Sequence, residues 1–342
     1  MNPLKKKIKN DDNSILNYLE NTKLFDIDIS SLRSKNFYKE MLNNREKYYK
    51  KYKKFLNKKL SQNCILCGNK TNKAFLSWKE YILFECDYCG SVFPNINFKS
   101  FSKSDFFIDN STKHDDFMLE MLNTFNYRKK TFGAERYEYL KSKYKRFNKN
   151  FSVLDYGCGS GYFIELLKNK KISAKGIDLD NNAVNFCKKR GMDVSNSELG
   201  DEKNNQYDLI TMFDSIEHFH DPVSVFKTAH KKLREKGRIL AYTPNIRSLS
   251  TYLMGTEHNA LAVFDHVCLY NYKSLKYLAN KSKFFIESID YYGLDIKDYL
   301  QMKESKDNIN YNKKLNDLSN LLQAFLDKSK QSNHMRIIFR KK

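Results

Sequence analysis

The chain of 342 residues contains no run of eighteen apolar residues, so we expect no segment that spans a membrane. Its first residues, Met1 to Lys7, are basic but have no apolar core behind them, and therefore lack the form of a secretory signal. We expect a cytoplasmic protein whose seven cysteines are reduced. Glycine is also scarce, with 12 residues in all, yet three of them alternate in one short stretch.

This stretch joins a short apolar strand to a glycine-rich loop. The strand ends in Asp155, and Gly157, Gly159 and Gly161 follow before a predicted helix. Because glycine has no Cβ, such a loop can bend sharply and present backbone N–H groups to a ligand at the start of the helix. The loop reads D-x-G-x-G-x-G, which differs from the G-x-G-x-x-G of dinucleotide sites. A carboxylate at Asp155 favours a nucleotide-type ligand that carries positive charge.

A second strand, predicted over residues 174–178, ends in another carboxylate. Asp178 stands seventeen residues after Gly161, which fits a strand–helix–strand unit. An acid at the tip of the second strand can accept hydrogen bonds from both hydroxyls of a ribose. Asp180 is the weaker candidate for this role, because its place before Asn181 fits the N-cap of the next helix.

Strands and helices continue to alternate, which predicts an α/β fold with a mostly parallel sheet of about seven strands. The predicted strands cover residues 151–155, 174–178, 192–195, 207–213, 237–243, 284–289 and 334–340. The predicted helices cover residues 162–170, 182–190, 222–234, 273–281 and 314–328. The last helix has Leu315, Leu318, Leu321, Leu322 and Phe325 on one side. We expect this side to pack on the rest of the domain or on a second subunit.

The glycine loop and Asp178 resemble motif I and the acidic position that follows it in class I S-adenosylmethionine-dependent methyltransferases. The segment Glu217-His218-x-x-Asp221-Pro222 is similar to a pattern found in many small-molecule methyltransferases of the type 11, 12 and 23 groups, including quinone O-methyltransferases. The resemblance implies a Rossmann-like sheet with helices on both faces, an antiparallel last strand, and S-adenosylmethionine as the methyl donor.

The same resemblance implies which residues form the site. Those that would hold the donor are Asp155, Gly157, Cys158, Gly159, Gly161, Asp178, Leu179, Phe213 and Asp214. Glu217 and His218 would lie near the donor or the acceptor, and His266 would face the acceptor. Methyl transfer is a one-step displacement, so the enzyme must align the acceptor, exclude water and, for a hydroxyl, remove a proton. His218 and His266 are both candidates for the general base, and for each a structural role is the alternative.

Four cysteines precede this region in two C-x-x-C-G pairs. Cys64 and Cys67 are separated from Cys86 and Cys89 by eighteen residues, which is the spacing of a four-thiolate zinc site. The glycine after each pair permits a tight turn around the metal, and the aromatic-rich segment 73–84 suits a small hairpin. Four protein ligands leave no open position, so we expect a structural Zn²⁺ ion. Two disulfides are the alternative, which a reducing compartment disfavours.

A cysteine ribbon directly before such a domain is similar to bacterial enzymes that methylate sugars, surface polysaccharides or secondary metabolites. The predicted parts are a basic helical segment (1–60), a zinc ribbon (61–98), a helical linker over the cofactor (99–148) and a methyltransferase domain (149–342) with a helical insert at 298–333. Within the first part we expect one basic helix over residues 37–60. We expect a small-molecule or saccharide acceptor, with O-methylation favoured over C-methylation. The chain could also form a homo-oligomer.

The net charge of +21 supports a different acceptor. A strongly basic chain with a zinc module also suits an RNA base methyltransferase. Against this, the positive charges are spread along the chain, and no N-P-P-Y type of motif, which many nucleic-acid methyltransferases use to hold a base, follows residues 207–213. A third interpretation is a scaffold or cofactor-binding protein without catalysis. The intact Asp155, glycine loop and Asp178 disfavour it.

Overall fold

A computed structural model describes residues 27–104, 106, 119–144 and 147–342 of the chain. Its centre is a seven-stranded sheet in the order β11-β12-β10-β9-β6-β7-β8. The strands are β6 (Ser152–Tyr156), β7 (Ser173–Ile177), β8 (Val194–Ser195), β9 (Tyr207–Phe213), β10 (Leu233–Pro244), β11 (Phe284–Tyr291) and β12 (His334–Lys341). Strand β12 runs in the opposite direction to the other six, so it pairs antiparallel with β10 and β11, while the other neighbouring strands pair in parallel. The predicted α/β fold with an antiparallel last strand is confirmed.

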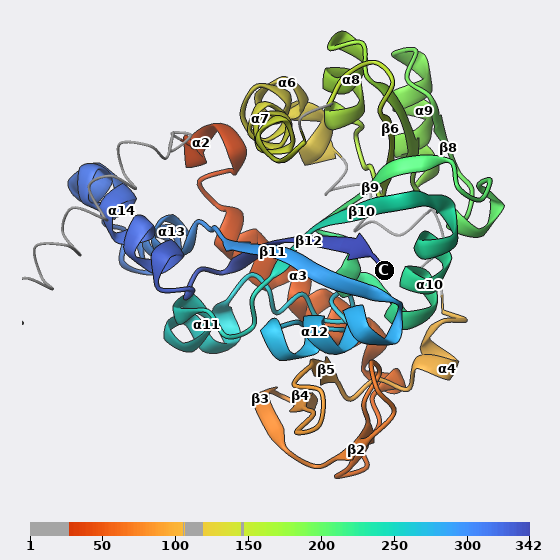
Figure 1. The fold of residues 1–342 in the computed structure, drawn as a ribbon. Helices are drawn as coiled ribbons and strands as arrows, with labels where there is room; N and C mark the ends of the chain where they lie inside the picture. The colour runs from red at the N-terminus through yellow and green to blue at the C-terminus, as the bar shows by residue number, and fades with distance from the viewer. Residues whose placement is uncertain (1–26, 105, 107–118, 145–146) are drawn as a thin grey trace, which may run out of the picture.

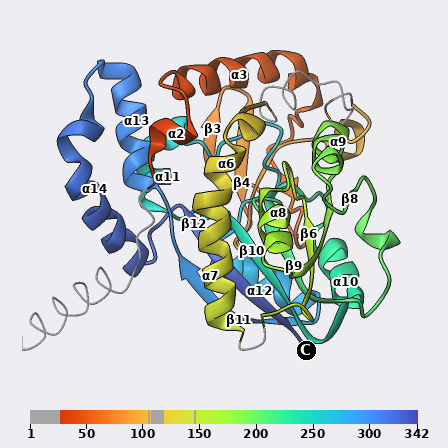
Figure 2. The ribbon, with the colours of Figure 1, turned by 90° about the horizontal axis from the view of Figure 1, so that it is seen from above.

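Helices cover both faces of the sheet (Figure 1). One face carries α7 (Ala134–Lys143), α8 (Tyr162–Asn169) and α9 (Asn181–Lys189), and the other carries α10 (Pro222–Lys232) and α12 (Tyr272–Lys281). The apolar run of β9 serves both layers, because alternate residues of a strand point to opposite faces. Leu209 packs with Phe163 and Val184 on the first face, whereas Ile210 packs with Phe226 on the second. Figure 2 shows α7 lying across the first face beside α8.

Two helices begin at an acidic capping residue, and the first of these, Asp180, confirms the expectation from the sequence. The Asp180 carboxylate accepts hydrogen bonds from the backbone N–H groups of Asn182 and Ala183. The Asp221 carboxylate accepts one from Ser224 N–H, with Pro222 in the first turn of α10. Because Asp180 caps α9, Asp178 remains the acid at the tip of β7.

The cysteine ribbon is built from five short strands. These are β1 (Gln62–Asn63), β2 (Lys70–Thr71), β3 (Ala74–Trp78), β4 (Tyr81–Glu85) and β5 (Val92–Pro94). The expected hairpin is the β3–β4 pair, and β5 adds a third strand to it. Val92 also pairs with Leu269 of the sheet domain, and Phe84 belongs to the same hydrophobic core as Tyr270. The ribbon therefore shares a core with the sheet domain.

The N-terminal and linker helices pack around these two parts. They are α2 (Ile29–Leu32), α3 (Phe37–Tyr52), η1 (Lys53–Phe55), α4 (Phe98–Phe101), α6 (Phe125–Arg128) and the π-helical turn η3 (Lys129–Gly133). The basic helix predicted over 37–60 ends at Tyr52, and its aromatic side is buried: the Tyr52 ring lies 5.8 Å from that of Phe264. Residues 1–26, 105, 107–118 and 145–146 of the predicted N-terminal segment and linker lie outside the described residues.

The insert before β12 differs from the prediction. It contains two helices, α13 (Asp295–Asp307) and α14 (Tyr311–Lys328), where the sequence predicted one. The apolar side of α14 packs on the rest of the domain only in part: Leu315 and Leu321 are partly buried, whereas Leu318, Leu322 and Phe325 are 51%, 40% and 45% exposed. The helix also docks through polar groups, since Gln323 Nε2 donates to Asp295 Oδ2 at 3.1 Å. Whether a second subunit covers the apolar side stays a prediction.

The remaining short elements connect strands at the edges of the sheet. They are η4 (Leu199–Asp201), η5 (Ile216–His218), α11 (Leu249–Met254) and η6 (Gly255–Glu257). Among the described residues, no helix combines the length and the hydropathy that crossing a bilayer requires.

Candidate active site

The glycine loop between β6 and α8 adopts a conformation that requires glycine. Gly157, Gly159 and Gly161 have φ angles of +79°, +52° and +71°. A Cβ atom on Gly157 would lie 2.6 Å from Ser215 Oγ, and one on Gly161 would lie 2.7 Å from Cys187 Sγ. The loop therefore lies in close contact with Ser215, just after β9, and with α9. A larger residue at Gly157 or Gly161 would force the loop or these neighbours to move.

Asp155 lies in the floor of this loop and is only 2% exposed. Thr211 Oγ1 donates a hydrogen bond of 2.6 Å to its carboxylate. Burial raises the pKa of Asp155 to about 6, although the Thr211 hydroxyl and the charge of Arg136 oppose this shift. Because this pKa lies below 7, the carboxylate is ionised at neutral pH and can act on a ligand above the loop through its negative charge. Cys158, the next predicted residue, is buried in the same loop.

Asp178 ties the tip of β7 to the loop. Gly159 N–H donates to Asp178 Oδ2 at 2.7 Å, and Asp180 N–H donates to Oδ1 at 2.9 Å. A carboxylate at the tip of this strand can accept hydrogen bonds from ribose hydroxyls. Leu179, which follows, is 67% exposed and offers an apolar surface beside the loop. The predicted donor-binding residues of β6 and β7 are therefore brought together.

Asp214 stands directly after β9, between two charged residues that the sequence did not suggest. Arg136 Nη2 of α7 lies 3.6 Å from its carboxylate, and His334 Nε2 of β12 lies 3.3 Å from it. Burial opposes the charged forms of Asp214 and His334, but their hydrogen bond and opposite charges outweigh it. As a result, the pKa of Asp214 is held below its usual value and that of His334 above it.

The predicted aromatic residue at the end of β9 lies against the same group. The guanidinium carbon of Arg136 sits 3.9 Å from the centre of the Phe213 ring, and the Tyr242 ring lies 4.9 Å from that ring. Arg136 and His334 are far from Asp214 in the sequence, and only the packing of α7 and β12 brings them to it. No sequence motif marked either of them.

Glu217, His218 and His266 form a second polar cluster. Backbone N–H groups of Val267 and Cys268 donate to the Glu217 carbonyl at 2.8 and 3.0 Å, which brings the segment before α12 against η5. The ligand atoms of the three side chains all lie within 4.8 Å of one another, so the cluster could also hold a metal ion. The three predicted catalytic candidates thus share one site.

Glu217 is fully enclosed in this cluster. Thr243 Oγ1 donates to its carboxylate at 2.9 Å. Burial raises the pKa of Glu217 to about 7, while the nearby charge of His218 opposes the shift. A carboxyl group that titrates near neutral pH suits proton transfer.

The two histidines differ in what holds their rings. His218 Nδ1 lies 3.2 Å from Asp265 Oδ1 and 3.1 Å from the Asp265 carbonyl oxygen, whereas His266 Nδ1 lies 2.8 Å from the Ala260 carbonyl oxygen. An acceptor at Nδ1 favours the tautomer with hydrogen on Nδ1, which makes Nε2 the nitrogen that can take up a proton. His218 therefore has a carboxylate behind its ring. The sequence did not single out Asp265.

The four ribbon cysteines converge as predicted. Cys64 and Cys89 have their Sγ atoms 3.5 Å apart, and so have Cys67 and Cys86. All four ligand atoms lie within 4.8 Å of one another, and all four cysteines are free thiols. Four sulfurs at about 2.3 Å from a tetrahedral zinc would be about 3.8 Å apart, so the cluster fits this ion. Gly68 and Gly90 have φ angles of +77° and +79°, as tight turns after each pair require.

Comparison with known proteins shows what this arrangement resembles. Residues 127–289 match the family described as methyltransferase domain. This segment of the chain is therefore similar to that family. The match runs from the end of α6 into β11, and so includes the glycine loop, Asp178 and the histidine cluster.

Several relatives are named ubiquinone biosynthesis O-methyltransferase. One from Methylococcus capsulatus is 32% identical over 111 residues, which cover 30% of this chain and 46% of that protein. One from Pseudomonas paraeruginosa is 26% identical over 119 residues, covering 31% and 51%. The chain thus spans about half the length of these two relatives. A solved S-adenosylmethionine-dependent methyltransferase from Archaeoglobus fulgidus is 19% identical with a TM-score of 0.46, covering 66% of this chain and 99% of that one.

Proposed function

We propose that the chain is an S-adenosylmethionine-dependent methyltransferase that methylates a hydroxyl group of a polar small molecule or saccharide. One observation carries the proposal. The glycine loop, fixed by Asp178, touches Ser215, and the cluster of Glu217, His218 and His266 begins two residues further along the chain. A donor site and a proton-accepting site are therefore adjacent at the carboxyl edge of the sheet, where open α/β sheets bind ligands.

The donor side follows from the residues around the loop. S-adenosylmethionine, when bound, supplies an electrophilic methyl group on a positively charged sulfur. Asp178 would accept the ribose hydroxyls, and Leu179 would contact the apolar face of the base. The buried charge of Asp155 would attract the cationic part of the ligand. The loop N–H groups at the start of α8 would complete the cradle.

On the acceptor side we propose His218 as the general base. Its Nε2 atom would take the proton of the acceptor hydroxyl, and the Asp265 carboxylate would hold the ring and stabilise its charged form. Asp214, Arg136 and His334 add charged groups to the adjoining wall, which favours a polar acceptor. The names of the relatives support oxygen as the acceptor atom. The ribbon cysteines would hold a structural Zn²⁺ ion.

Two experiments test this proposal in order. Calorimetric titration of the full chain with S-adenosylhomocysteine should give one saturable site, and Asp178→Ala should weaken it at least ten-fold. Absence of binding would leave the chain as a scaffold. Disruption of the gene, followed by mass spectrometry of surface glycans and small metabolites, should then reveal loss of one methyl increment.

RNA is the alternative acceptor, because the net charge of +21 suits a polyanion. Incubation of the purified protein with labelled donor and unmodified ribosomal RNA decides between the two. Incorporation of label into RNA, together with strongly salt-dependent retention on it, would replace the small-molecule acceptor. Incorporation into hydroxylated small molecules alone would support the proposal.

A further inference from the structure

A cavity of about 530 Å³ lies at the junction between the cysteine ribbon and the methyltransferase domain. Its walls come from β4 and the second cysteine turn, the loop after β10, the start of α12, and the turn between α14 and β12. This volume lies within the range of small-molecule binding sites. The proposed function does not use this cavity.

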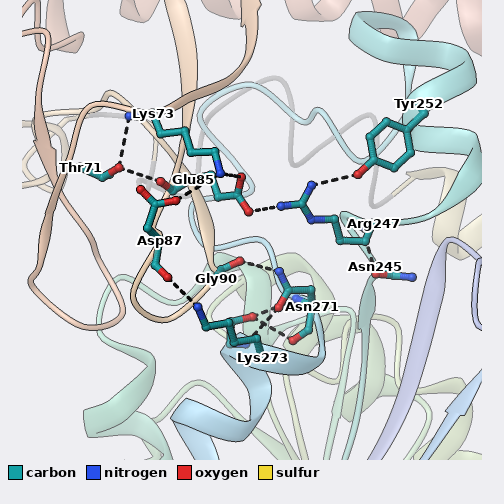
Figure 3. Close-up of polar contacts among 11 residues, drawn as sticks. Thr71, Lys73, Glu85, Asp87, Gly90, Asn245, Arg247, Tyr252, Asn271 and Lys273 are labelled. Atoms are coloured by element: carbon teal, nitrogen blue, oxygen red, sulfur yellow. Dashed lines mark hydrogen bonds and ion pairs between the residues drawn. The ribbon is translucent and has the colours of Figure 1, made fainter.

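Contacts across the junction hold the walls in place (Figure 3). Arg247, from the loop after β10, pairs with Glu85 of the ribbon and also donates to Tyr252 Oη at 2.9 Å. Asn271, the N-cap of α12, donates through Nδ2 to the Gly90 carbonyl oxygen at 2.6 Å. A ligand would therefore meet a site that is already formed, which lowers the cost of binding.

The lining carries more positive than negative charge. It includes four cations (Lys73, Arg247, Lys273 and Lys330) and two acids (Glu85 and Asp87). The acids already have partners, because Lys73 Nζ lies 3.1 Å from Glu85 and 3.2 Å from Asp87, and Arg247 pairs with Glu85. The two remaining cations therefore lack a carboxylate partner from the lining.

These two cations, Lys273 and Lys330, both line the cavity. Lys273 Nζ donates to a neutral group, the Asp87 carbonyl oxygen, at 2.6 Å, and an ammonium has two further hydrogens. Lys330 donates its backbone N–H to the Asp327 carbonyl oxygen at 3.2 Å, and within the described part of the chain its ammonium group has no hydrogen-bond or ion-pair partner. The turn after α14 fixes its backbone at a φ of +63°.

Two tyrosines add groups suited to a hydroxyl-bearing ligand. Tyr272, in the first turn of α12, is 50% exposed, and Tyr291, at the end of β11, is partly buried. Neither hydroxyl group forms a hydrogen bond with any described residue. Each can donate to and accept from a ligand hydroxyl, while the ring offers an apolar face.

We propose that this cavity binds a small molecule that combines an anionic group with hydroxyl groups, such as a sugar phosphate, and that Lys273 and Lys330 contact the anionic group. The molecule could be the remote end of the methyl acceptor or a separate ligand. Asn245 lines the cavity. Thr243, two residues earlier in the chain, contacts Glu217. The cavity and the cluster of Glu217, His218 and His266 therefore lie at the same edge of the sheet.

Calorimetry on the full, zinc-loaded chain at constant ionic strength tests the proposal. The probes are D-glucose 1-phosphate, inorganic phosphate and, as the neutral match, D-glucose. We expect glucose 1-phosphate to bind at one site more tightly than either of the others. Lys273→Gln and Lys330→Gly should each weaken it at least five-fold.

The chain offers matched controls. Lys330→Gly places glycine at a positive φ, so the melting temperature should not fall. Lys276→Gln removes the same charge from an exposed position on α12 outside the cavity and should leave the affinity unchanged. S-adenosylhomocysteine binding, measured on the same samples, reports on the proposed function independently of the cavity.

The proposal is overturned if neither glucose 1-phosphate nor inorganic phosphate binds saturably. It is also overturned if all three variants lose affinity equally, because the binding would then reflect only the basic surface. If binding is confirmed, kinetics distinguish the source of the ligand. Inhibition by glucose 1-phosphate that is competitive with the acceptor identifies the remote end of the acceptor. Binding that leaves the acceptor KM unchanged identifies a separate ligand.

Discussion

The Nδ1 atom of His218 lies 3.2 Å from a carboxylate oxygen of Asp265. The Nδ1 atom of the neighbouring His266 lies 2.8 Å from the backbone carbonyl oxygen of Ala260. A carboxylate stabilises the imidazolium that forms when a histidine accepts a proton, whereas a neutral carbonyl does so less. This contrast is the basis for assigning the two histidines different roles.

We predict that His218→Ala lowers kcat by about 10²–10⁴-fold, the usual contribution of a general base. Asp265→Asn should cause a smaller loss, because the ring keeps its place but loses the charge behind it. Steady-state kinetics with an acceptor identified by gene disruption and mass spectrometry will measure both. Calorimetry with S-adenosylhomocysteine should give wild-type affinity for each variant. A greater loss of kcat in His266→Ala than in His218→Ala would reverse the assignment.

A second prediction concerns the pH dependence of donor binding. Asp155, with a pKa of about 6, is ionised above this pH and neutral below it. A cationic ligand favours the ionised form, so affinity for S-adenosylmethionine should be high at pH 8 and lower at pH 5. If only the ionised form binds, the decrease is about ten-fold. S-adenosylhomocysteine, which lacks the sulfonium charge, should change less.

The control for this prediction must separate two carboxyl groups. Glu217 also titrates near neutrality, with a pKa of about 7, and it lies close to the donor site. The titration is therefore repeated in Glu217→Gln, where the decrease near pH 6 should persist, and in Asp155→Asn, where it should disappear. A decrease that survives in Asp155→Asn contradicts the assignment to Asp155.

A third prediction tests the backbone of the glycine loop. Gly157→Ala adds a Cβ only 2.6 Å from Ser215 Oγ at a φ of +79°, so the loop must shift. We expect a loss of ~1–3 kcal/mol of unfolding free energy and a clear fall in donor affinity. Gly255→Ala is the matched control, because Gly255 also has a positive φ, +53°, but no atom within 4 Å of the added Cβ. Thermal unfolding and calorimetry measure both variants. Equal donor affinities in the two would show that contact with Ser215 is unimportant.

Local patterns predicted the central part of the fold. The strands from β6 to β10, the capping role of Asp180, and the glycine loop all depend on residues close together in the sequence. The Asp155–Thr211 and Asp178–Gly159 contacts follow from strand order and from the strand–loop–helix unit. The family resemblance, not spacing, supplied the position of the last strand.

The insert shows where such patterns fail. Helix α13 buries polar residues, among them Asp295, Asp298 and Gln301, so it has no apolar stripe by which to recognise it. Helix α14 has such a stripe, but turns part of it outward and docks through Gln323. Hydrogen bonds between distant segments decide both orientations. For the same reason the sequence did not predict the contacts of Arg136 and His334 with Asp214, which form only through tertiary packing.

The last prediction concerns metal removal. Each chain should bind one Zn²⁺ ion through its four ribbon cysteines. The amount of bound zinc is measured by modifying the thiols, which releases the ion to a colorimetric chelator. Because Cys64, Leu66 and Phe84 belong to the same core as Tyr270 and Leu275, loss of the ion should destabilise the sheet domain as well as the ribbon. Chelation should therefore lower the melting temperature of the whole chain in one cooperative transition, and Cys67→Ser should do the same without chelator. Added Zn²⁺ should restore the wild type but not the variant. Stability to chelator combined with loss of stability on reduction would instead indicate two disulfides.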